Sequence, residues 1–343
     1  MRVALLSNVT VDLLASMLKK NHEVYLSAGF DTWQQEILLS SSGLYSYRPE
    51  AVVILLYSGA YSWEDKSSGF QLIDEWCSVL RSLSYNLPST PVFISSIDVK
   101  ENCHFGSDLR LERLFENYFI EQVEELHRQV ANYYILPVKE LVTRIGRDNF
   151  YSAKMWYVGS MPYSMKGLAE MDNLINRYIS VTKGMHKKCI AVDLDNTLWG
   201  GVIGEDGVDG IILSEHKEGA RYYDAQRLLK WMKNQGVMLA IISKNNTEDV
   251  EPIFGNPAMV LQHEDFVAEI INWEPKSANI RKLATTLNIG LDSFVFLDDN
   301  PAEREQMKAE CPEVAVIEFP KDSSLLPETI IKMYYDYFLS LEV

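Results

Sequence analysis

Residues 189–204, CIAVDLDNTLWGGVIG, decide how the chain is expected to fold. Cys189 to Val192 form a short apolar run, which predicts a fully buried strand ending on Asp193. Asp195 follows two residues later, and side chains at i and i+2 share one face of an extended chain. Open α/β sheets bind ligands at the carboxyl ends of their strands, so both carboxylates can reach one ligand there. Two adjacent carboxylates repel each other and need a cation or a proton between them.

Other chemically useful side chains follow at comparable places further along the chain. They are Ser243 after the predicted strand Val237–Ile242, Lys276 at the start of a helical run to about Leu287, and the pair Asp298 and Asp299 after the predicted strand Phe294–Leu297. At one edge of a parallel sheet they would join Asp193 as a hydroxyl, an ammonium group and metal ligands. Phosphoryl transfer needs this set: a nucleophile, charge neutralisation and a hard cation with oxygen ligands.

Each of these residues taken alone also has a simpler interpretation. A carboxylate at a strand end often caps the next helix, and Asp298 and Asp299 precede Asn300 and Pro301, which together form a good helix start. Lys276 alone would most often be a solvated residue of a first helical turn. The order of all four elements favours the catalytic interpretation over these alternatives.

The spacing Asp-x-Asp-x-Thr after a hydrophobic strand resembles the first signature of the haloacid dehalogenase (HAD) superfamily. The resemblance implies that Asp193 attacks phosphorus and that Asp195 is the general acid and base. It also implies that Ser243 and Lys276 hold the phosphoryl group. Mg²⁺ would be bound by Asp193, the backbone carbonyl of Asp195, Asp298 and Asp299.

A closer resemblance extends over essentially the whole chain. The stretches DLDNTLWGGVIGEDG, ISKNN, NWEPKSANI and FLDDNPAERE resemble the FkbH-like proteins of HAD subfamily IIIC, whose full-length members also carry an N-terminal α/β domain. That resemblance implies a phosphorylated three-carbon substrate, 1,3-bisphosphoglycerate, and an acyl carrier protein as partner. A phosphate would be removed, and the glyceryl unit would be loaded onto the carrier's phosphopantetheine thiol.

Alternating strand and helix patterns predict an α/β protein with two domains, residues 1–184 and 185–343. Strands are expected at Arg2–Leu6, Glu23–Ser27, Ala51–Tyr57, Pro91–Ser95, Tyr133–Leu136, Cys189–Leu194, Val237–Ile242, Ala268–Asn272, Phe294–Asp298 and Ala315–Phe319. Helices are expected near Val9–Leu18, Gln71–Leu83, Asp108–Ala131, Met165–Val181, Glu218–Gln235, Ser277–Leu287, Ala302–Ala309 and Leu326–Leu341. The first domain is expected to be a flavodoxin-like doubly wound sheet and the second a Rossmann-like HAD domain.

The second domain is expected to lack an inserted cap domain. Only 22 residues separate Asp195 from Glu218, in a glycine-rich stretch that favours a hairpin, and only 32 separate Ser243 from Lys276. Neither gap is long enough for a further domain. An uncapped site is open and can admit a large substrate or a partner protein.

Composition excludes several classes of protein. The net charge of −16 argues against nucleic acid and anionic membranes as partners, and no run of 18 apolar residues is present. Residues 1–184 carry 17 basic and 21 acidic residues, a net of −4, and residues 185–343 carry 15 and 27, a net of −12. A docked acidic carrier would therefore need a local basic patch, such as residues 110–113 or 144–154. Four well-separated cysteines predict free thiols in a reducing cytoplasm.

The N-terminal domain weakly resembles SGNH hydrolases, in which a serine follows the first strand. Ser7 occupies that place and is a candidate acyl nucleophile, although the chain has no clear counterpart of the hydrolases' Asp-x-x-His. A serine without a base is a weak nucleophile, so Ser7 is alternatively a helix N-cap or a relic. Cys103, beside His104, is the other candidate. Direct attack of a carrier thiol on an acyl phosphate, a plain phosphatase and a carrier-binding scaffold with a vestigial site all remain open.

Overall fold

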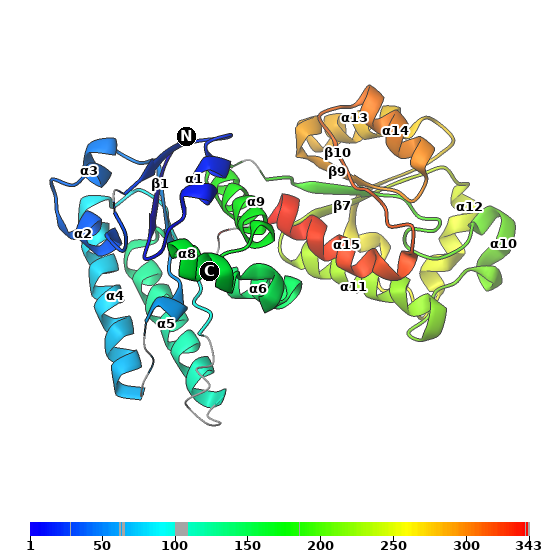
Figure 1. The fold of residues 1–343 in the computed structure, drawn as a ribbon. Coiled ribbons are helices and arrows are strands. Elements are labelled where there is room, and N and C mark those ends of the chain that lie inside the picture. Colours follow the sequence, from blue (N-terminus) through cyan, green and yellow to red (C-terminus); the bar gives the residue numbers. More distant parts are fainter. Residues whose placement is uncertain are drawn as a thin grey trace. The chain divides into compact units, whose positions relative to one another are not determined.

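The computed structural model describes residues 1–27, 29–61, 63, 66–99, 109–184, 186–339 and 341. The chain divides into two compact units, one formed mainly by Met1–Gly184 and the other by Met185–Ser340. Each unit is an α/β domain built on one parallel five-stranded sheet (Figure 1). No helix among the described residues is both long enough and apolar enough to cross a membrane.

The sheet of the first unit has the strand order β2-β1-β3-β4-β5, with every pair parallel. The strands are β1 (Arg2–Ser7), β2 (Glu23–Leu26), β3 (Ala51–Leu55), β4 (Val92–Ser95) and β5 (Tyr133–Leu136). This is the doubly wound, flavodoxin-like order in which the chain builds outward in both directions from β1. The predicted strands of this unit are all present, within two residues at each end.

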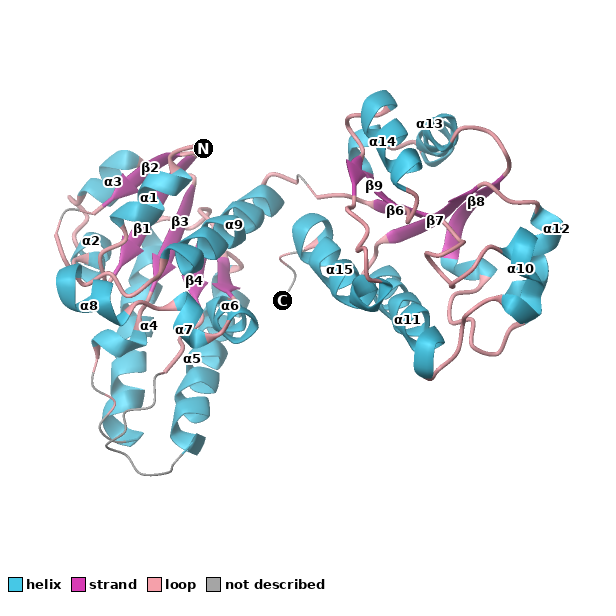
Figure 2. Ribbon diagram, turned by 45° about the vertical axis from the view of Figure 1, so that its right-hand side comes forward, coloured by secondary structure: helices cyan, strands magenta, loops and turns pink. Residues whose placement is uncertain are grey.

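Helices cover both faces of the first sheet (Figure 2). They are α1 (Asp12–Leu18), α2 (Trp33–Leu38), α3 (Gly43–Tyr47), α4 (Lys66–Asn86), α5 (Leu109–Val130), α6 (Val138–Ile145), α7 (Arg147–Phe150), α8 (Ala153–Gly159) and α9 (Met165–Thr182). Leu6, Ile54 and Ile94 belong to a core with residues of α4 and α5, whereas the ring of Phe93 points to the other face and contacts Tyr178 of α9.

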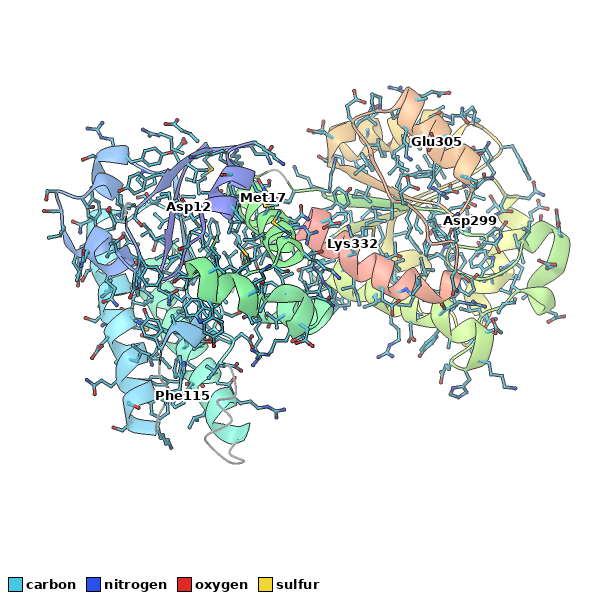
Figure 3. The ribbon with its side chains drawn as sticks, in the orientation of Figure 1. Asp12, Met17, Phe115, Asp299, Glu305 and Lys332 are labelled. Atoms are coloured by element: carbon cyan, nitrogen blue, oxygen red, sulfur yellow. The ribbon has the colours of Figure 1, made fainter. Side chains whose placement is uncertain are left out.

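The packing of α5 against α4 depends on a glycine in α4. The ring of Phe115, labelled in Figure 3, is fully buried and lies 2.4 Å from the position where a Cβ atom at Gly69 would stand. A side chain at Gly69 would therefore displace the Phe115 ring. The short helices α2, α3, α6, α7 and α8 were not predicted, because four to eight residues give only a weak helical period. Helix α1, of seven residues, was predicted within the longer range Val9–Leu18.

The sheet of the second unit has the order β10-β9-β6-β7-β8, again with every pair parallel. The strands are β6 (Cys189–Val192), β7 (Met238–Ser243), β8 (Phe266–Ile271), β9 (Phe294–Leu297) and β10 (Ala315–Val316). Alternate strand residues face two cores. Ile190, Val192 and Ile241 share one with Leu229 and Ile330. The residues on the opposite face share the other with helices that precede and follow β9.

The larger helices of the second unit are α11 (Ala220–Asn234) and α15 (Leu326–Met333) on one face, and α13 (Lys276–Leu287) and α14 (Pro301–Glu310) on the other. Helix α15 continues as a π-helical turn at Tyr334–Phe338, so the helix expected to reach Leu341 changes its winding. Between β6 and α11 the hairpin-like expectation was incomplete. An antiparallel bridge joins Gly200 and Ile212, but the short helix α10 (Ile203–Gly210) lies between them.

No domain is inserted at either possible cap position, since both segments are fully described. Only α10 and a 3₁₀ turn at Lys217–Gly219 separate β6 from α11. Between β7 and β8 lie α12 (Thr247–Val250) and two 3₁₀ turns, Glu251–Gly255 and His263–Asp265. The carboxyl ends of the strands in this unit are therefore not covered by a cap domain.

A buried glutamine in α11 ties together the two segments that carry the polar strand ends. Gln226 Nε2 donates to the carbonyl of Leu198 at 2.7 Å. Gln226 Oε1 accepts from the backbone amides of Val260 at 2.9 Å and Leu261 at 3.1 Å. Since the side chain is completely buried, water cannot replace any of these bonds.

Replacement of this glutamine by leucine is expected to lower the free energy of unfolding by about 2–4 kcal/mol, because three backbone groups lose their partner in the interior. Chemical denaturation of the purified protein measures the change. Gln235→Leu, at the exposed position directly after α11, is the matched control and should change stability by no more than about 0.5 kcal/mol. Equal stability of the two variants would contradict this account of Gln226.

Candidate active site

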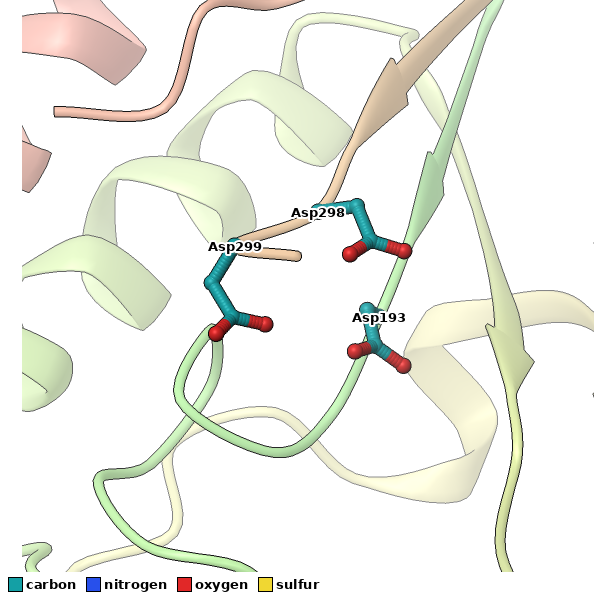
Figure 4. A group of neighbouring side chains, drawn as sticks. All are labelled: Asp193, Asp298 and Asp299. Carbon is teal, nitrogen blue, oxygen red and sulfur yellow. The ribbon is translucent and has the colours of Figure 1, made fainter. Parts of the chain in front are cut away.

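Four strand ends of the second unit deliver polar side chains to one edge of the sheet. Asp193 follows β6, Ser243 is the last residue of β7, Lys276 is the first residue of α13 after β8, and Asp298 and Asp299 follow β9. Parallel pairing of β9, β6 and β7 aligns these ends, because Val192 is in register with both Leu297 and Ile241. Figure 4 shows the carboxylates of Asp193, Asp298 and Asp299 converging from the two neighbouring strand ends.

Asp193 is held by a hydroxyl and an ammonium group. Ser243 Oγ donates to Asp193 Oδ1 at 2.7 Å, and Lys276 Nζ lies 2.8 Å from the same oxygen. The ammonium group also contacts Asp298 Oδ2 at 2.6 Å. Lys276 is only 3% exposed, so it is not the solvated helix residue that the simpler interpretation suggested.

The acidic pair after β9 does not cap the helix that follows it. Asn300 caps α14, because its side chain accepts a hydrogen bond from the backbone amide of Ala302. Asp298 Oδ1 accepts from the backbone amide of Asn300, which turns its other oxygen toward Lys276. The simpler interpretation of these two carboxylates as helix caps is therefore wrong.

Asp193, Asp298 and Asp299 form a group that could hold a metal ion. One oxygen from each carboxylate lies within 4.8 Å of the others. Burial, followed by repulsion from Asp193, raises the pKa of Asp298 to about 6 and that of Asp299 to about 7. Three carboxylates and one ammonium group leave two negative charges unbalanced, which fits a divalent cation with oxygen ligands.

Asp195 lies beside this group without belonging to it. Its Oδ1 accepts hydrogen bonds from Trp199 Nε1 at 3.0 Å and from the backbone amide of Ile203 at 3.1 Å, at the start of α10. Its Oδ2 accepts one from Asn245 Nδ2 at 3.1 Å. Burial raises the pKa of the Asp195 carboxyl above its ordinary value, and Oδ2, with a single donor, is the better placed oxygen to carry a proton.

Three residues of this site were missed in the sequence. Asn245 Nδ2 also contacts Ser243 Oγ at 3.1 Å, so it links the hydroxyl to Asp195. Trp199 orients Asp195, and Arg304 Nη1 donates to the backbone carbonyls of Asp298 at 2.9 Å and Asp299 at 2.6 Å. Only the closeness of Asn245 to Ser243 in the chain could have suggested such a role. Trp199 and Arg304 look like ordinary core and helix residues in the sequence.

Of the two candidate nucleophiles of the first unit, only Ser7 belongs to the described residues. Ser7 is buried; its hydroxyl donates to the carbonyl of Leu55 at 2.8 Å and accepts from the amide of Val9 at 3.2 Å. This gives Ser7 a turn-forming role, and among the described residues its hydroxyl bonds only to these two backbone groups. It is not a helix N-cap either, since α1 begins at Asp12. Cys103 lies outside the described residues; Cys77, Cys189 and Cys311 are buried free thiols.

A solved structure resembles the chain over its whole length. It is the N-terminal part of the protein BF1531 from Bacteroides fragilis, containing a phosphatase domain complexed with Mg, with a TM-score of 0.90, 27% identity and coverage of 100% of this chain and 95% of that chain.

Two further solved structures resemble parts of the chain, with TM-scores too low to support an argument. They are a lipase/acylhydrolase from Enterococcus faecalis (TM-score 0.37, 17% identity, 52% of this chain and 94% of that one) and 3-deoxy-D-manno-octulosonate 8-phosphate phosphatase from Moraxella catarrhalis (0.29, 18%, 46% and 91%). No family model matches the chain, and no curated protein sequence does.

Removal of the Asp299 carboxylate is expected to stabilise the metal-free protein near neutral pH. The folded-state pKa of Asp299 is raised to about 7, whereas the pKa of this group in an unfolded chain is about 4. Between these values the unfolded state ionises first, so the carboxyl lowers stability as the pH rises. Asp299→Asn should therefore resist denaturant better than the wild type above about pH 7, with no difference below about pH 4.

Denaturation in the presence of a chelator, at several pH values, measures this effect. Glu215→Gln removes an exposed carboxylate in the same unit and is the matched control. A gain of similar size in the control, or an advantage of Asp299→Asn that grows toward acid pH, would contradict the role given to Asp299.

Proposed function

We propose that the protein is a Mg²⁺-dependent phosphatase that works through a phosphorylated aspartate. The observation that carries the proposal is the position of the Asp193 carboxylate, which Ser243 and Lys276 hold next to Asp298 and Asp299. The likeness at 27% identity to a phosphatase domain complexed with Mg supports it. Asp193, Asp298, Asp299 and the backbone carbonyl of Asp195 would hold the ion. When bound, it supplies positive charge against the phosphoryl oxygens.

In the first step a carboxylate oxygen of Asp193 attacks phosphorus, and the bond from phosphorus to the leaving oxygen breaks. Asp195, whose pKa is raised by burial, gives its proton to the leaving oxygen. Ser243 Oγ and Lys276 Nζ, which already contact Asp193, neutralise the equatorial oxygens as charge builds up.

In the second step Asp195, now ionised, takes a proton from water as the water oxygen attacks the aspartyl phosphate. The bond between Asp193 and phosphorus breaks, and inorganic phosphate leaves with the original carboxylate restored. Trp199, Asn245 and the amide of Ile203 hold the Asp195 carboxyl in one orientation through both steps.

Asp193→Asn is expected to lower phosphate release by at least about a thousandfold, because the amide is a poor nucleophile. Release of inorganic phosphate from 4-nitrophenyl phosphate and acetyl phosphate measures it, with and without added Mg²⁺. The exposed Asp224, paired with Arg227 on α11, provides the control Asp224→Asn, which should keep full activity. Full turnover by Asp193→Asn would reject Asp193 as the nucleophile, and wild-type turnover that a chelator does not lower would reject the dependence on Mg²⁺.

We further propose that the substrate is an acyl phosphate of the kind of 1,3-bisphosphoglycerate and that the glyceryl unit goes to an acyl carrier protein. Two observations support this finer proposal. The stretches DLDNTLWGGVIGEDG, ISKNN, NWEPKSANI and FLDDNPAERE resemble the FkbH-like proteins, and the strand ends of the second unit have no cap domain over them. A site without a cap can admit a carrier-bound substrate.

The transfer needs no nucleophile from the first unit. The thiol sulfur of the carrier attacks the acyl carbon and forms the thioester, the bond from that carbon to the phosphate oxygen breaks, and inorganic phosphate leaves with the proton of the thiol. The remaining phosphate ester is then hydrolysed at Asp193. The geometry of Ser7, whose hydroxyl is occupied by a backbone carbonyl, favours this route.

Docking of an acidic carrier meets a charge problem, since the protein itself carries a net charge of −16. In the segment 144–154, Arg144 pairs with Glu170 and Arg147 pairs with Asp98. Lys154 is then the cation of this segment that has no ion pair with a described residue. The side chain of Arg110 in the other candidate segment lies outside the described residues.

Intact-mass spectrometry of a holo acyl carrier protein tests the finer proposal. After incubation with the protein, Mg²⁺ and 1,3-bisphosphoglycerate, the carrier is expected to gain a glyceryl unit, and the gain of that mass should be absent with Asp193→Asn. Phosphate release without any gain on the carrier would reject the transfer and leave the phosphatase proposal standing.

A further inference from the structure

A pocket of about 470 Å³ lies within the first unit, separate from the phosphatase site just proposed. Its volume falls in the range of small-molecule sites, roughly 300–1,000 Å³. Six of the residues around it are aromatic: Tyr57, Tyr61, Trp63, Tyr151, Trp156 and Tyr157. No activity proposed above uses this pocket.

The pocket sits where a doubly wound sheet binds its ligands. The strand order reverses between β1 and β3, and Tyr57 follows the carboxyl end of β3. Asn8, which follows β1, fixes this junction with its side chain. Nδ2 of Asn8 donates to the backbone carbonyl of Tyr57 at 2.9 Å, and Oδ1 of Asn8 accepts from the backbone amide of Tyr57 at 2.8 Å. The amide of Thr10 donates to the carbonyl of Ser160, which attaches the end of α8 to the same edge.

The aromatic walls come from two segments that are held in place. Tyr57 contacts the ring of Trp156 on α8 at a centroid distance of 5.2 Å and that of Tyr151 at 5.6 Å. The ring also covers Gly59, where an added Cβ atom would lie 2.5 Å from the Tyr57 hydroxyl. Trp63 is anchored by its indole, which donates to the carbonyl of Ser58 at 2.9 Å. Contacts within the protein thus fix the rings of Tyr57, Trp156 and Trp63.

The polar groups of the pocket carry no excess of positive charge. Arg147 Nη2 donates to Asp98 Oδ1 at 2.7 Å, and the Tyr151 hydroxyl donates to Asp98 Oδ2 at 2.9 Å. Asp98 is buried, so it balances the guanidinium at close range. Asp148, which also lines the pocket, adds a further negative charge. A phosphate or carboxylate ligand would therefore be repelled.

Polar tips remain available among the rings. Within the described part of the chain, the Tyr57 hydroxyl, the Trp156 indole and the Tyr157 hydroxyl make no hydrogen bond to another protein group. An aliphatic chain would fill the space but would leave these groups without partners. A ligand is favoured that has both apolar C–H faces for the rings and hydroxyl groups for the polar tips.

We propose that this pocket binds a neutral carbohydrate. The rings of Trp156, Tyr57 and Tyr157 stack on its C–H faces, because the face of an aromatic ring is its negative side. The guanidinium of Arg147, held by Asp98, and the carboxylate of Asp148 then donate to and accept from neighbouring hydroxyls. The proposal does not depend on the phosphatase activity, since a neutral sugar has no phosphoryl group for Asp193.

Saturation-transfer NMR on the full-length protein tests it. The probes are three neutral glycosides: methyl α-D-glucopyranoside, methyl β-D-galactopyranoside and methyl N-acetyl-β-D-glucosaminide. A carboxylated glycoside, methyl β-D-glucuronide, and a flat aromatic amide, nicotinamide, are the counter-probes. At least one neutral glycoside is expected to receive saturation, and both counter-probes are expected to receive none from this pocket.

Two variants locate the binding. Trp156→Ala and Tyr157→Ala should each weaken binding by roughly tenfold or more. Tyr157 is 85% exposed, so its removal spares the fold. Tyr85, 80% exposed at the end of α4, gives the matched control Tyr85→Ala, which should bind as the wild type does. All three variants should keep the far-UV circular dichroism and the denaturation midpoint of the wild type, which shows that the first unit is folded.

Three outcomes would overturn the proposal: no saturation of any neutral glycoside, binding that is unchanged in both pocket variants, or a pocket-dependent preference for the glucuronide or nicotinamide. None of them bears on the phosphatase assignment, which is decided by Asp193→Asn.

Discussion

A buried ammonium group between two carboxylates is the interaction on which the site of the second unit depends. Lys276 contacts Asp193 and Asp298 at 2.8 and 2.6 Å, in a place where neither Lys276 nor Asp298 reaches solvent to any extent. Such charges are costly to remove from water, and each is tolerated only because the others are present. One ammonium group cannot balance three carboxylates. Burial, and after it repulsion from Asp193, therefore raises the pKa values of Asp298 and Asp299. The same imbalance makes this cluster a suitable cradle for a divalent cation.

A layer of hydrogen bonds around the cluster keeps its members from relaxing away from one another. Arg304 holds the backbone on which Asp298 and Asp299 stand. Asn245 joins Ser243 to Asp195. The side chain of Gln226 joins Leu198, in the segment after β6, to Val260, in the segment after α12. The repulsion among the carboxylates is thus opposed by a rigid backbone, which is what preorganisation for a phosphoryl transition state requires.

The two units carry different side chains at the same edge of a parallel sheet. In the second unit the carboxyl ends of the strands carry charged groups around a small cluster. In the first unit they lead into aromatic loops, and its buried Asp98 is already neutralised by Arg147. The backbone arrangement brings strand ends together in both cases, and the side chains at those ends decide what the edge can bind.

Much of this protein could be predicted from its sequence, because buried parallel strands are continuous apolar runs and their ends are marked by polar residues. The positions of Asp193, Ser243, Lys276 and Asp298 at four such ends follow from that pattern alone. The short helices, including α10 where a plain hairpin was expected, could not be predicted, since they have too few residues for a period.

Only the tertiary structure decided the contacts between strand ends that are distant in the chain. It showed that Lys276 is buried against Asp298, that Asn300 rather than Asp298 caps α14, and that Ser7 is bonded to Leu55. It also gathered Tyr57, Arg147 and Trp156 around one pocket. The reason is physical: apolar patterning acts locally along the chain, whereas the partner of a polar side chain depends on which strands lie next to each other.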